Sequence, residues 1–436
     1  MRSASGMEMA RILTTVASGA GVVLAGLLVR RYGTLAVLIT CGIMAVHPES
    51  IAAAHTVLVE PWLVLFCLIG ALALFDGDQL AHGRRLAWAG VAFGFGGAVE
   101  AWAIVPVLVA IGLFWPRLKR AWPFCVGVAA GFLVPVLPFA ALAPRQFYNS
   151  VIVAQILRAS PARAPVWGRL ANIVGIVNPT PGQEAMVFVI SIVVAVVVVA
   201  MIAAAWLVSR RPPPLLERFV VLTSALVILM FCLADQFYYH FVAFLVPFLA
   251  MAVGLAASRL VETAQPRADR AGAGALLRWS ATGLAAALVL LLAFSEIGTV
   301  HRQYHNNVFI VRTSMVPAID RVSRPGDCVL TDQVAYTILA NRFLSDVPGC
   351  SLMDDPTGAD LALSHGRTPS SGAGNVPAVA AVWWDAFRHA RVVMLTSRSF
   401  KRVAWAPGLM TYFHDHFRLV AHYRTGDTLY VRTASG

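Results

Sequence analysis

The chain has 436 residues, of which 58% are hydrophobic and 13% are charged. Because soluble domains carry about 25% charged residues, this composition excludes an ordinary soluble protein and predicts a polytopic membrane protein. The net charge of +12 could indicate nucleic-acid binding, but the Lys and Arg residues cluster in short loops between apolar runs. That clustering is the positive-inside pattern of membrane proteins, so we expect contact with membrane lipids and no nucleic-acid partner.

Apolar runs long enough for membrane helices recur along the first 297 residues. A helix that crosses a bilayer needs about 17–25 residues. The pattern predicts about ten crossings, at residues 11–29, 34–48, 56–76, 87–99, 101–115, 122–143, 185–208, 218–235, 241–258 and 279–297.

The short basic loops give the orientation of these crossings. By the positive-inside pattern we expect the cytoplasmic loops to be those with Arg30-Arg31, Arg84-Arg85, Arg117/Lys119/Arg120, Arg210-Arg211 and Arg267/Arg270/Arg278. Two of these loops flank the apolar block 87–115, so that block crosses an even number of times. We expect a hairpin of two short helices, broken near Gly96-Gly97 and turning close to Glu100. A re-entrant element buried in protein is the alternative.

The stretch VHPESIAAAHTVLVEPW, residues 46–62, places two His and two Glu between two crossings. Ionisable groups near membrane depth are costly and usually mark a functional site. Glu60 directly precedes Pro61 at the start of a helix, where its charge meets the helix dipole and free N–H groups. It is either a capping acid at a wet interface or a catalytic acid that faces an outer cavity. His55 and Glu49 are predicted substrate ligands from the same turn.

Glu100, at the predicted hairpin tip, has no ionic partner nearby in the sequence. We expect an Arg or His from another outer loop beside it. A further polar group lies in DQFYYH, where a crossing begins. Tyr residues at this depth often form only an aromatic belt, but the added acid and imidazole indicate a substrate site made of Asp235, Tyr238, Tyr239 and His240.

The long segment 144–184 is amphipathic in part and can lie in the membrane interface. An apolar face of Ile152, Val153, Ile156 and Leu157 is surrounded by Arg145, Arg158, Arg163 and Arg169. In Q-I-L-R, Gln155 and Arg158 are three residues apart and share a helical face. Because Arg binds phosphate bidentately, they suit a phosphorylated lipid head group, with Arg145 nearby. The alternative is an interfacial Arg that meets ordinary anionic lipid.

After residue 297 the chain becomes more polar and reads as a small α/β domain, 298–436, on the outer face, following a transmembrane domain 1–297. DCVLTD, RVVMLTS, FRLVAHY and DTLYVR predict strands. PAIDRV and PAVAAVWWDAFRHA predict helices. Cys328 and Cys350 could form a disulfide if this part is exported. We find no phosphate-binding glycine loop, and HDH at 414–416 is too compact to predict a metal site.

The order of these segments resembles the C-type superfamily of polytopic membrane glycosyltransferases (GT-C), especially the group near the protein O-mannosyltransferases and the lipid A aminoarabinose transferases. Six stretches carry the resemblance, namely ARILTTVASGAGVVLAGLLVRRYG, HTVLVEPWLVLFCL with Glu60 before Pro, the hairpin LAWAGVAFGFGGAVEAWAIVPVLVA, the outer-loop QILR, the helix start FYYHFVAFLVPFLA and DCVLTDQVAYTILANRF. In the layout of its segments, the resemblance covers most of the chain.

The resemblance implies a reaction at the outer face of a bacterial plasma membrane. A hexosyl or pentosyl group passes from a polyprenyl-phosphate carrier to a lipid, glycan or protein acceptor. Glu60 would act as the carboxylate that deprotonates the acceptor hydroxyl, and Arg residues would stabilise the departing phosphate. No cofactor is predicted, and a divalent metal is left open.

The sequence departs from that family at its start. The family places its main catalytic acid in a first outer loop after a first helix, whereas here Glu8 is the only acid before the helix that resembles the second one. We expect either that the coding region continues upstream with a further helix and an acidic loop, or that another acid serves. The alternative is a non-catalytic membrane protein, such as a transporter or an assembly subunit. A transporter should show paired repeats with broken helices, whereas here the polar groups gather on one side.

Overall fold

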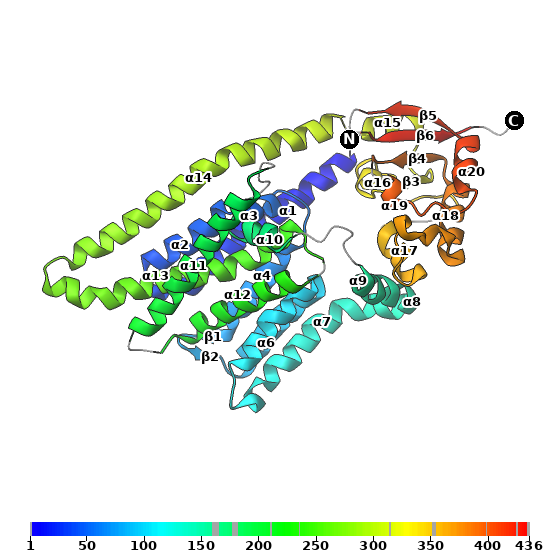
Figure 1. Ribbon diagram of the computed structural model, residues 1–436. Helices are drawn as coiled ribbons and strands as arrows, with labels where there is room; N and C mark the ends of the chain where they lie inside the picture. The colour runs from blue at the N-terminus through cyan, green and yellow to red at the C-terminus, as the bar shows by residue number, and fades with distance from the viewer. Residues whose placement is uncertain are drawn as a thin grey trace. The chain divides into compact units, whose positions relative to one another are not determined.

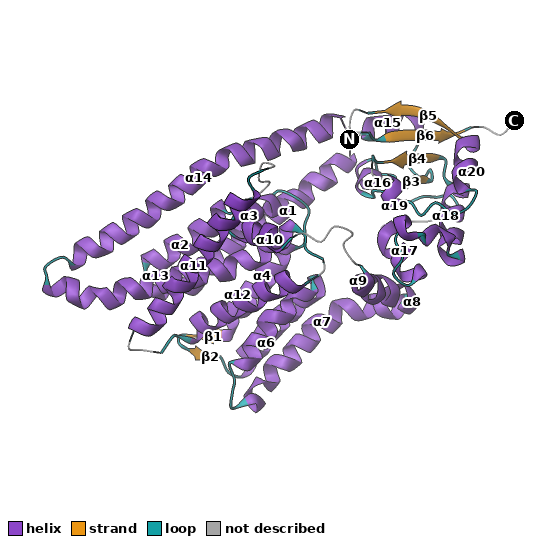
Figure 2. Ribbon diagram, in the orientation of Figure 1, coloured by secondary structure: helices purple, strands orange, loops and turns teal. Residues whose placement is uncertain are grey.

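The computed structural model describes residues 2–158, 165–176, 182–209, 212–234, 236–313, 315–350, 355–397, 399–423 and 426–433. The chain forms two compact units. The helical unit comprises residues 10–138 and 162–303, and the C-terminal unit comprises residues 1–9, 139–161 and 304–436. Helices make up most of the described chain. Its strands form a hairpin of two very short strands and one small four-stranded sheet (Figure 2).

Each of the ten predicted apolar runs lies on a helix. The long elements are α1 (Arg2–Val29), α2 (Thr34–Val46), α4 (Glu60–Leu74), α5 (Gly83–Val99), α6 (Ile104–Gly112), α7 (Trp122–Leu142), α11 (Glu184–Val208), α12 (Leu215–Leu233), α13 (Val242–Arg270) and α14 (Gly274–Thr313). Shorter pieces are α3 (Pro48–Ala54), α10 (Val166–Ile173), β1 (Phe75–Asp76), β2 (Gln79–Leu80) and the 3-10 turns η1 (Arg30–Tyr32), η2 (Ala101–Ala103), η3 (Leu118–Ala121) and η5 (Tyr239–Phe241).

Among the described residues, six helices are long and apolar enough to cross a membrane, and the bent pair α2–α3 makes a seventh if it counts as one span. The two helices of that pair meet at 64°. Glu60–Leu74 and Ala101–Gly112 are apolar but shorter. The protein is therefore a multi-pass membrane protein, as the composition predicts. The number of ten crossings stays a prediction.

The α13 helix lies at the centre of the helical unit. It packs against α2, α4, α11 and α12 (Figure 1), and 78% of its apolar window is buried, compared with 11% for α11. The exposed apolar side chains of α11 are typical of a helix that faces lipid. The first half of α13 is therefore held inside the protein, whereas Arg267 and Arg270 at its far end are exposed.

The turn predicted close to Glu100 is confirmed, but the predicted break near Gly96-Gly97 is wrong. Helix α5 continues through both glycines to Val99, and the backbone becomes extended at Glu100, with φ −159° and ψ 142°. A Cβ at Gly96 would meet Cys67 Sγ at 3.4 Å and the Ala103 Cβ at 3.6 Å. This glycine therefore serves close helix packing and does not interrupt the helix.

Helices α5 and α7 touch through four glycines. A Cβ at Gly90 would lie 2.1 Å from Phe124 O, and a Cβ at Gly127 would lie 2.1 Å from Ala87 O. Gly94 and Gly131, one turn further along each helix, are equally close to the opposite backbone. Small residues four apart share a helical face and let two backbones approach inside a membrane. This contact holds α5, and with it the position of Glu100.

The C-terminal unit contains a four-stranded sheet in the order β3-β4-β6-β5. Strand β3 (Val329–Thr331) is parallel to β4 (Val392–Leu395), and β6 (Thr428–Arg432) is antiparallel to both β4 and β5 (Phe417–His422). All four predicted strands are confirmed. So are the two predicted helices, α15 (Val316–Val322) and α18 (Pro377–His389).

Four further helices in this unit, α16 (Ala335–Leu339), α17 (Pro356–Ser364), α19 (Ser399–Arg402) and α20 (Leu409–His416), were not predicted. The HDH tripeptide lies at the end of α20, where His416 Nδ1 faces Tyr412 O at 2.9 Å. Cys328 and Cys350 form the disulfide that their position suggested. Trp383, Phe387 and Phe413 fill a core beside the sheet.

Residues 144–158 belong to the C-terminal unit. They form α8 (Pro144–Phe147), a π-helical turn, η4 (Tyr148–Val153), and α9 (Ala154–Leu157), and both η4 and α9 pack against α17. Ile156 remains 78% exposed and Tyr148 59% exposed. An apolar face left open in this way fits the predicted position in a membrane interface.

Candidate functional site

A buried carboxylate–imidazole pair lies where two central helices of the helical unit begin. Pro61 favours a helix start at Glu60, because proline suits the first turn, and η5 places His240 just before α13. The Glu60 side chain is 0% exposed, and its Oε1 is hydrogen-bonded to Nδ1 of His240. Neither of its oxygens accepts a backbone N–H among the described residues, and the side chain is buried, which argues against a capping acid at a wet interface.

Glu60 is one of the residues that line a cavity. Oε2 is buried and has no hydrogen-bond partner among the described residues. The cavity has a volume of about 220 Å³ and is lined by small and apolar side chains of α1 to α4 and α13, including Ser18, Ser50 and Pro247. Among the lining residues that the structure describes, Glu60 alone is ionisable. A buried acceptor without a partner is costly, so this oxygen is available to a ligand.

Glu49 lies beside this pair and is held by a residue that the sequence analysis missed. Glu49 is 6% exposed, and its Oε1 accepts a hydrogen bond from Asn172 Nδ2 at 2.9 Å. His47 Nδ1 accepts the Glu49 backbone N–H at 3.3 Å. Helix α3, which carries Glu49, packs against η5 and α13. The only signal for Asn172 was its spacing of three from Arg169 in a short apolar segment.

Glu100 completes a group of three carboxylates around one imidazole. It lies near enough to Glu60 and His240 to interact with both charges, and Glu49 likewise interacts with Glu60 and His240. His240 is thus an imidazole whose charge Glu100 senses, and an Arg or His in direct contact with Glu100 stays a prediction. Glu100 Oε2 is buried and has no partner in the described part of the chain. Acids concentrated in this way suit proton transfer and the binding of hydroxyl groups.

The other predicted ligands of this region differ in their contacts. The Tyr238 ring stacks on His240 with centroids 5.6 Å apart, whereas Tyr239 packs edge-on against Phe237 at 6.1 Å. His55 turns back on its own helix, with Nδ1 2.6 Å from Ile51 O. Asp235 lies outside the described residues. Tyr238 therefore joins the group around Glu60, and His55 is not brought to it by any contact of its imidazole ring.

The amphipathic pattern of residues 144–184 predicted Arg169 at the membrane interface. The structure shows that this prediction is wrong. Arg169 is fully buried, and its Nη1 donates to Phe231 O at 2.5 Å and to Ala234 O at 2.6 Å. It therefore binds the free carbonyl groups where α12 ends. Its guanidinium also lies over the Phe237 ring at 5.3 Å. Arg163 lies outside the described residues.

The predicted phosphate ligands lie in the C-terminal unit. Arg158 follows the last residue of α9, with ψ 85°, and its Nη2 forms an ion pair with Asp355 Oδ2. Arg158 is half-buried, whereas Gln155 and Arg145 are exposed. That Gln155 and Arg158 share one helical face stays a prediction. Their predicted role in binding phosphate stays a prediction.

Comparison with known proteins bears on the fold. The sequence matches no protein-family model and no curated protein. Two solved structures of ArnT from Cupriavidus metallidurans resemble it. The one bound to undecaprenyl phosphate has a TM-score of 0.55 at 15% identity, covering 98% of this chain and 84% of that one. The apo structure has a TM-score of 0.53 at 13% identity, covering 97% and 83%. The resemblance to the GT-C group near the lipid A aminoarabinose transferases is thus confirmed at the level of architecture, and the chain has the fold of ArnT.

Proposed function

We propose that this protein is a membrane glycosyltransferase that moves a sugar from a polyprenyl-phosphate carrier to a hydroxyl group of an acceptor. The observation that carries the proposal is the Glu60–His240 pair, with one carboxylate oxygen unpartnered at a cavity. The shared fold supports it, since one ArnT structure holds undecaprenyl phosphate.

Glu60 acts as the general base. Its Oε2 takes the proton of the acceptor hydroxyl, and the acceptor oxygen bonds to the anomeric carbon of the sugar. The bond from that carbon to the phosphate oxygen breaks, and its electron pair leaves with the polyprenyl phosphate. An ionised carboxylate can only accept hydrogen bonds, so His240 donates from Nδ1 to Oε1 and fixes the orientation of Glu60.

The neighbouring groups bind the substrates. Glu49, Glu100 and Tyr238 hydrogen-bond to sugar hydroxyls in this proposal, whereas Tyr239 and His55 stay predicted ligands whose described contacts lie elsewhere. In the C-terminal unit, Arg158 with Gln155 and Arg145 binds the phosphate of the carrier. Guanidinium groups suit this role because they offer two parallel N–H donors to phosphate oxygens.

The reaction takes place at the outer face of a plasma membrane. The basic loops support this orientation through the positive-inside pattern. The Cys328–Cys350 disulfide supports it independently, because such bonds persist in oxidising compartments and are rare in the cytosol. The acceptor is a lipid, a glycan or a protein that reaches this face.

A turnover assay tests the proposal. The full chain in lipid nanodiscs is given a panel of undecaprenyl-phosphate sugars, and release of undecaprenyl phosphate is measured. Glu60→Gln should lower kcat on the order of 10²–10⁴-fold, because a positioned general base contributes that much. Glu217→Gln changes a carboxylate that is equally buried but bonded through both oxygens, and should keep most activity per folded molecule. Equal rates for Glu60→Gln and wild type, or no wild-type turnover with any donor, would contradict the proposal and favour a non-catalytic membrane protein.

A further inference from the structure

Arg158 uses only half of one guanidinium edge. Its Nη2 is paired with Asp355 Oδ2, while its Nε is buried and has no hydrogen-bond partner in the part of the chain that the structure describes. Nε and Nη2 together form the edge that meets two oxygens of a carboxylate or phosphate in a bidentate pair. The contact with Asp355 therefore leaves a donor that a phosphate would satisfy.

Asp355 cannot complete this edge because its other oxygen is engaged. Asp355 is the N-cap of α17, and its Oδ1 accepts the Gly358 N–H at 3.1 Å. Turning both oxygens toward Arg158 would release that N–H, which is one of the free donors at the helix start. Asp355 therefore contacts Arg158 through Oδ2 and the backbone of α17 through Oδ1, so the ion pair uses a single carboxylate oxygen.

Gly358 makes the close approach of the two side chains possible. A Cβ at this position would lie 3.0 Å from Arg158 Nη2 and would overlap Asp355 Oδ2. Arg158 Nη2 therefore lies against the one position in the first turn of α17 that has no side chain. The pair is also open to solvent, since the side chains of Arg158 and Asp355 are 22% and 44% exposed. Exposed ion pairs of this kind are weak and exchange partners readily.

We propose that Asp355 is a positioning residue that holds Arg158 while no donor is bound and yields it to the donor phosphate. The phosphodiester of the donor offers two non-bridging oxygens, whereas Asp355 offers Arg158 one, so the phosphate takes both Nε and Nη2. Donor binding then frees the start of α17 from Arg158, while Asp355 keeps its cap. This inference rests on the proposed function, because it takes the phosphate of a polyprenyl carrier as the competing anion.

A binding titration tests the competition. Undecaprenyl phosphate is titrated into nanodiscs that contain wild type or Asp355→Asn. Asparagine keeps the size and the capping ability of Asp355 but removes its charge. We expect Asp355→Asn to bind roughly two- to fivefold more tightly, which is the loss of one exposed ion pair. In an Arg158→Ala background the same change should have no effect. Gly358→Ala, which crowds the pair, should also tighten binding.

A charge-matched control separates competition from general repulsion of the anion. Asp320 lies in the same unit and pairs with Arg342 at 3.3 Å, so Asp320→Asn removes the same charge and should leave the affinity unchanged. Weaker or equal binding by Asp355→Asn overturns the inference while wild-type binding leaves the proposed donor intact. Absence of wild-type binding to undecaprenyl phosphate, which is the carrier part of the donor, overturns the proposed carrier itself.

A double-mutant cycle gives a readout that does not depend on turnover. Thermal unfolding of wild type, Arg158→Ala, Asp355→Ala and the double variant is followed with and without saturating undecaprenyl phosphate. The two residues should be coupled in the free protein, and that coupling should disappear when the ligand is bound. Coupling that persists at saturation shows that Asp355 never yields Arg158 and overturns the inference.

Discussion

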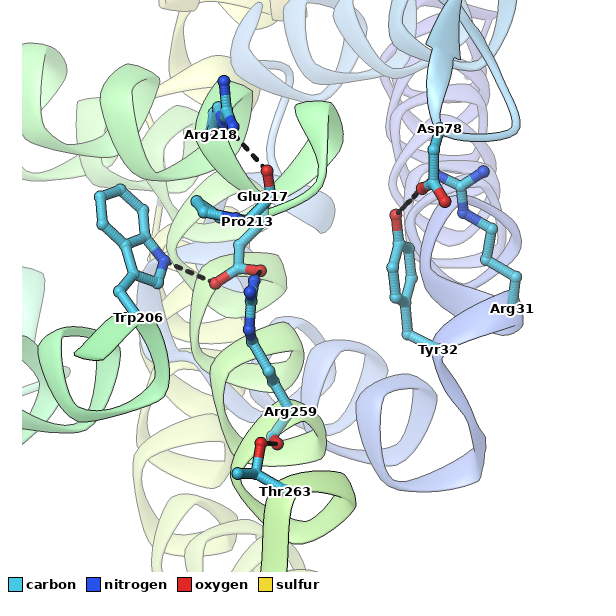
Figure 3. Close-up of polar contacts among 9 residues, drawn as sticks. All are labelled: Arg31, Tyr32, Asp78, Trp206, Pro213, Glu217, Arg218, Arg259 and Thr263. Carbon is cyan, nitrogen blue, oxygen red and sulfur yellow. Dashed lines mark hydrogen bonds and ion pairs between the residues drawn. The ribbon is translucent and has the colours of Figure 1, made fainter. Parts of the chain in front are cut away.

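Buried charge is partnered differently at the two ends of the helical unit. Where α12 begins, Glu217 accepts Trp206 Nε1 on Oε1 at 2.6 Å and Arg259 Nη1 on Oε2 at 2.7 Å (Figure 3). Where α4 begins, Glu60 has one oxygen on His240 and the other without a partner among the described residues. The first carboxylate is saturated by the protein, and the second keeps an acceptor for something else.

Helix α12 runs from the region of Glu217 to the other end of the helical unit. Glu217 lies in the first turn of α12, and the carbonyl groups of Phe231 and Ala234 at its far end accept from Arg169. At about 1.5 Å per residue, fourteen residues span roughly 20 Å. The comparison teaches that burial alone does not mark a functional acid, since Glu217 is as buried as its counterpart. What distinguishes Glu60 is its unused hydrogen-bonding capacity.

The largest effect on stability should come from breaking the saturated end. Glu217→Ala leaves Arg259 buried without its carboxylate, and removal of one partner of a buried pair costs about 3–5 kcal/mol. We expect that loss in the free energy of unfolding, measured by denaturant titration in detergent micelles, with little change in turnover per folded molecule. A stability like that of wild type would show that this end does not hold the bundle together.

A second unsaturated acid, Asp360 in the C-terminal unit, sharpens the comparison. Trp383 Nε1 donates to its Oδ1 at 2.8 Å, and its Oδ2 is buried without a partner. Burial, with the nearby charge of Asp355, raises the pKa of Asp360 to about 7. Here the unpartnered oxygen is neutralised by a proton at moderate pH.

This pKa predicts how stability depends on pH. Since the folded pKa exceeds the unfolded value of about 3.9, the stabilisation is fully present below about pH 4 and is lost as pH rises toward 7. The loss should be on the order of 2–4 kcal/mol. Hydrogen exchange in α18 of the full chain, followed over this pH range, measures it. Asp360→Asn should remove the slope, and a slope that persists in this variant would assign it to another group.

A smaller effect should follow from removing the support of Glu49. Asn172→Leu keeps a similar size but leaves Glu49 Oε1 without its donor, which costs about 1–3 kcal/mol. Turnover should fall as well, because Glu49 lies against the proposed site. His47→Gln serves as a neighbouring control. If Asn172→Leu lowers stability but not turnover, Glu49 belongs with the saturated acids such as Glu217.

The smallest effect is expected at the surface of the saturated end. Arg31 and Asp78 pair at 2.9 Å, with side chains 32% and 72% exposed (Figure 3). Exposed pairs contribute little, so Asp78→Ala should change the free energy of unfolding by less than about 0.5 kcal/mol. If Asp78→Ala lowered the free energy of unfolding as much as Glu217→Ala, then the exposure of an ion pair would not predict its contribution to stability at this end of the helical unit.

The sequence predicted single residues better than their partners. Glu60 and His240 were each selected because a polar residue at a helix start stands out in an apolar chain, but nothing local indicates that residues 180 positions apart form a pair. The same holds for Arg158 and Asp355, which are 197 positions apart. Long-range pairing follows from which helix ends meet, and one sequence does not record that.

Two errors have a common physical origin. Arg169 and the glycines at 96–97 were judged by local patterns that have two outcomes. An Arg beside apolar residues can face lipid head groups or, as here, the carbonyl groups at a helix end. A glycine pair in an apolar run can break a helix or admit a neighbour. The sequence predicted the helices because run length depends only on bilayer thickness.

The four glycines between α5 and α7 set a limit on variation in this protein. Each has the opposite backbone where its side chain would be, so alanine, the smallest possible replacement, already separates the helices. At neighbouring exposed positions such as Trp88 and Val126, we expect other apolar residues to be tolerated. In a complete survey of substitutions, Gly90, Gly94, Gly127 and Gly131 should therefore tolerate no replacement. These four positions lie two on each helix at a spacing of four, inside a segment whose other positions accept many residues.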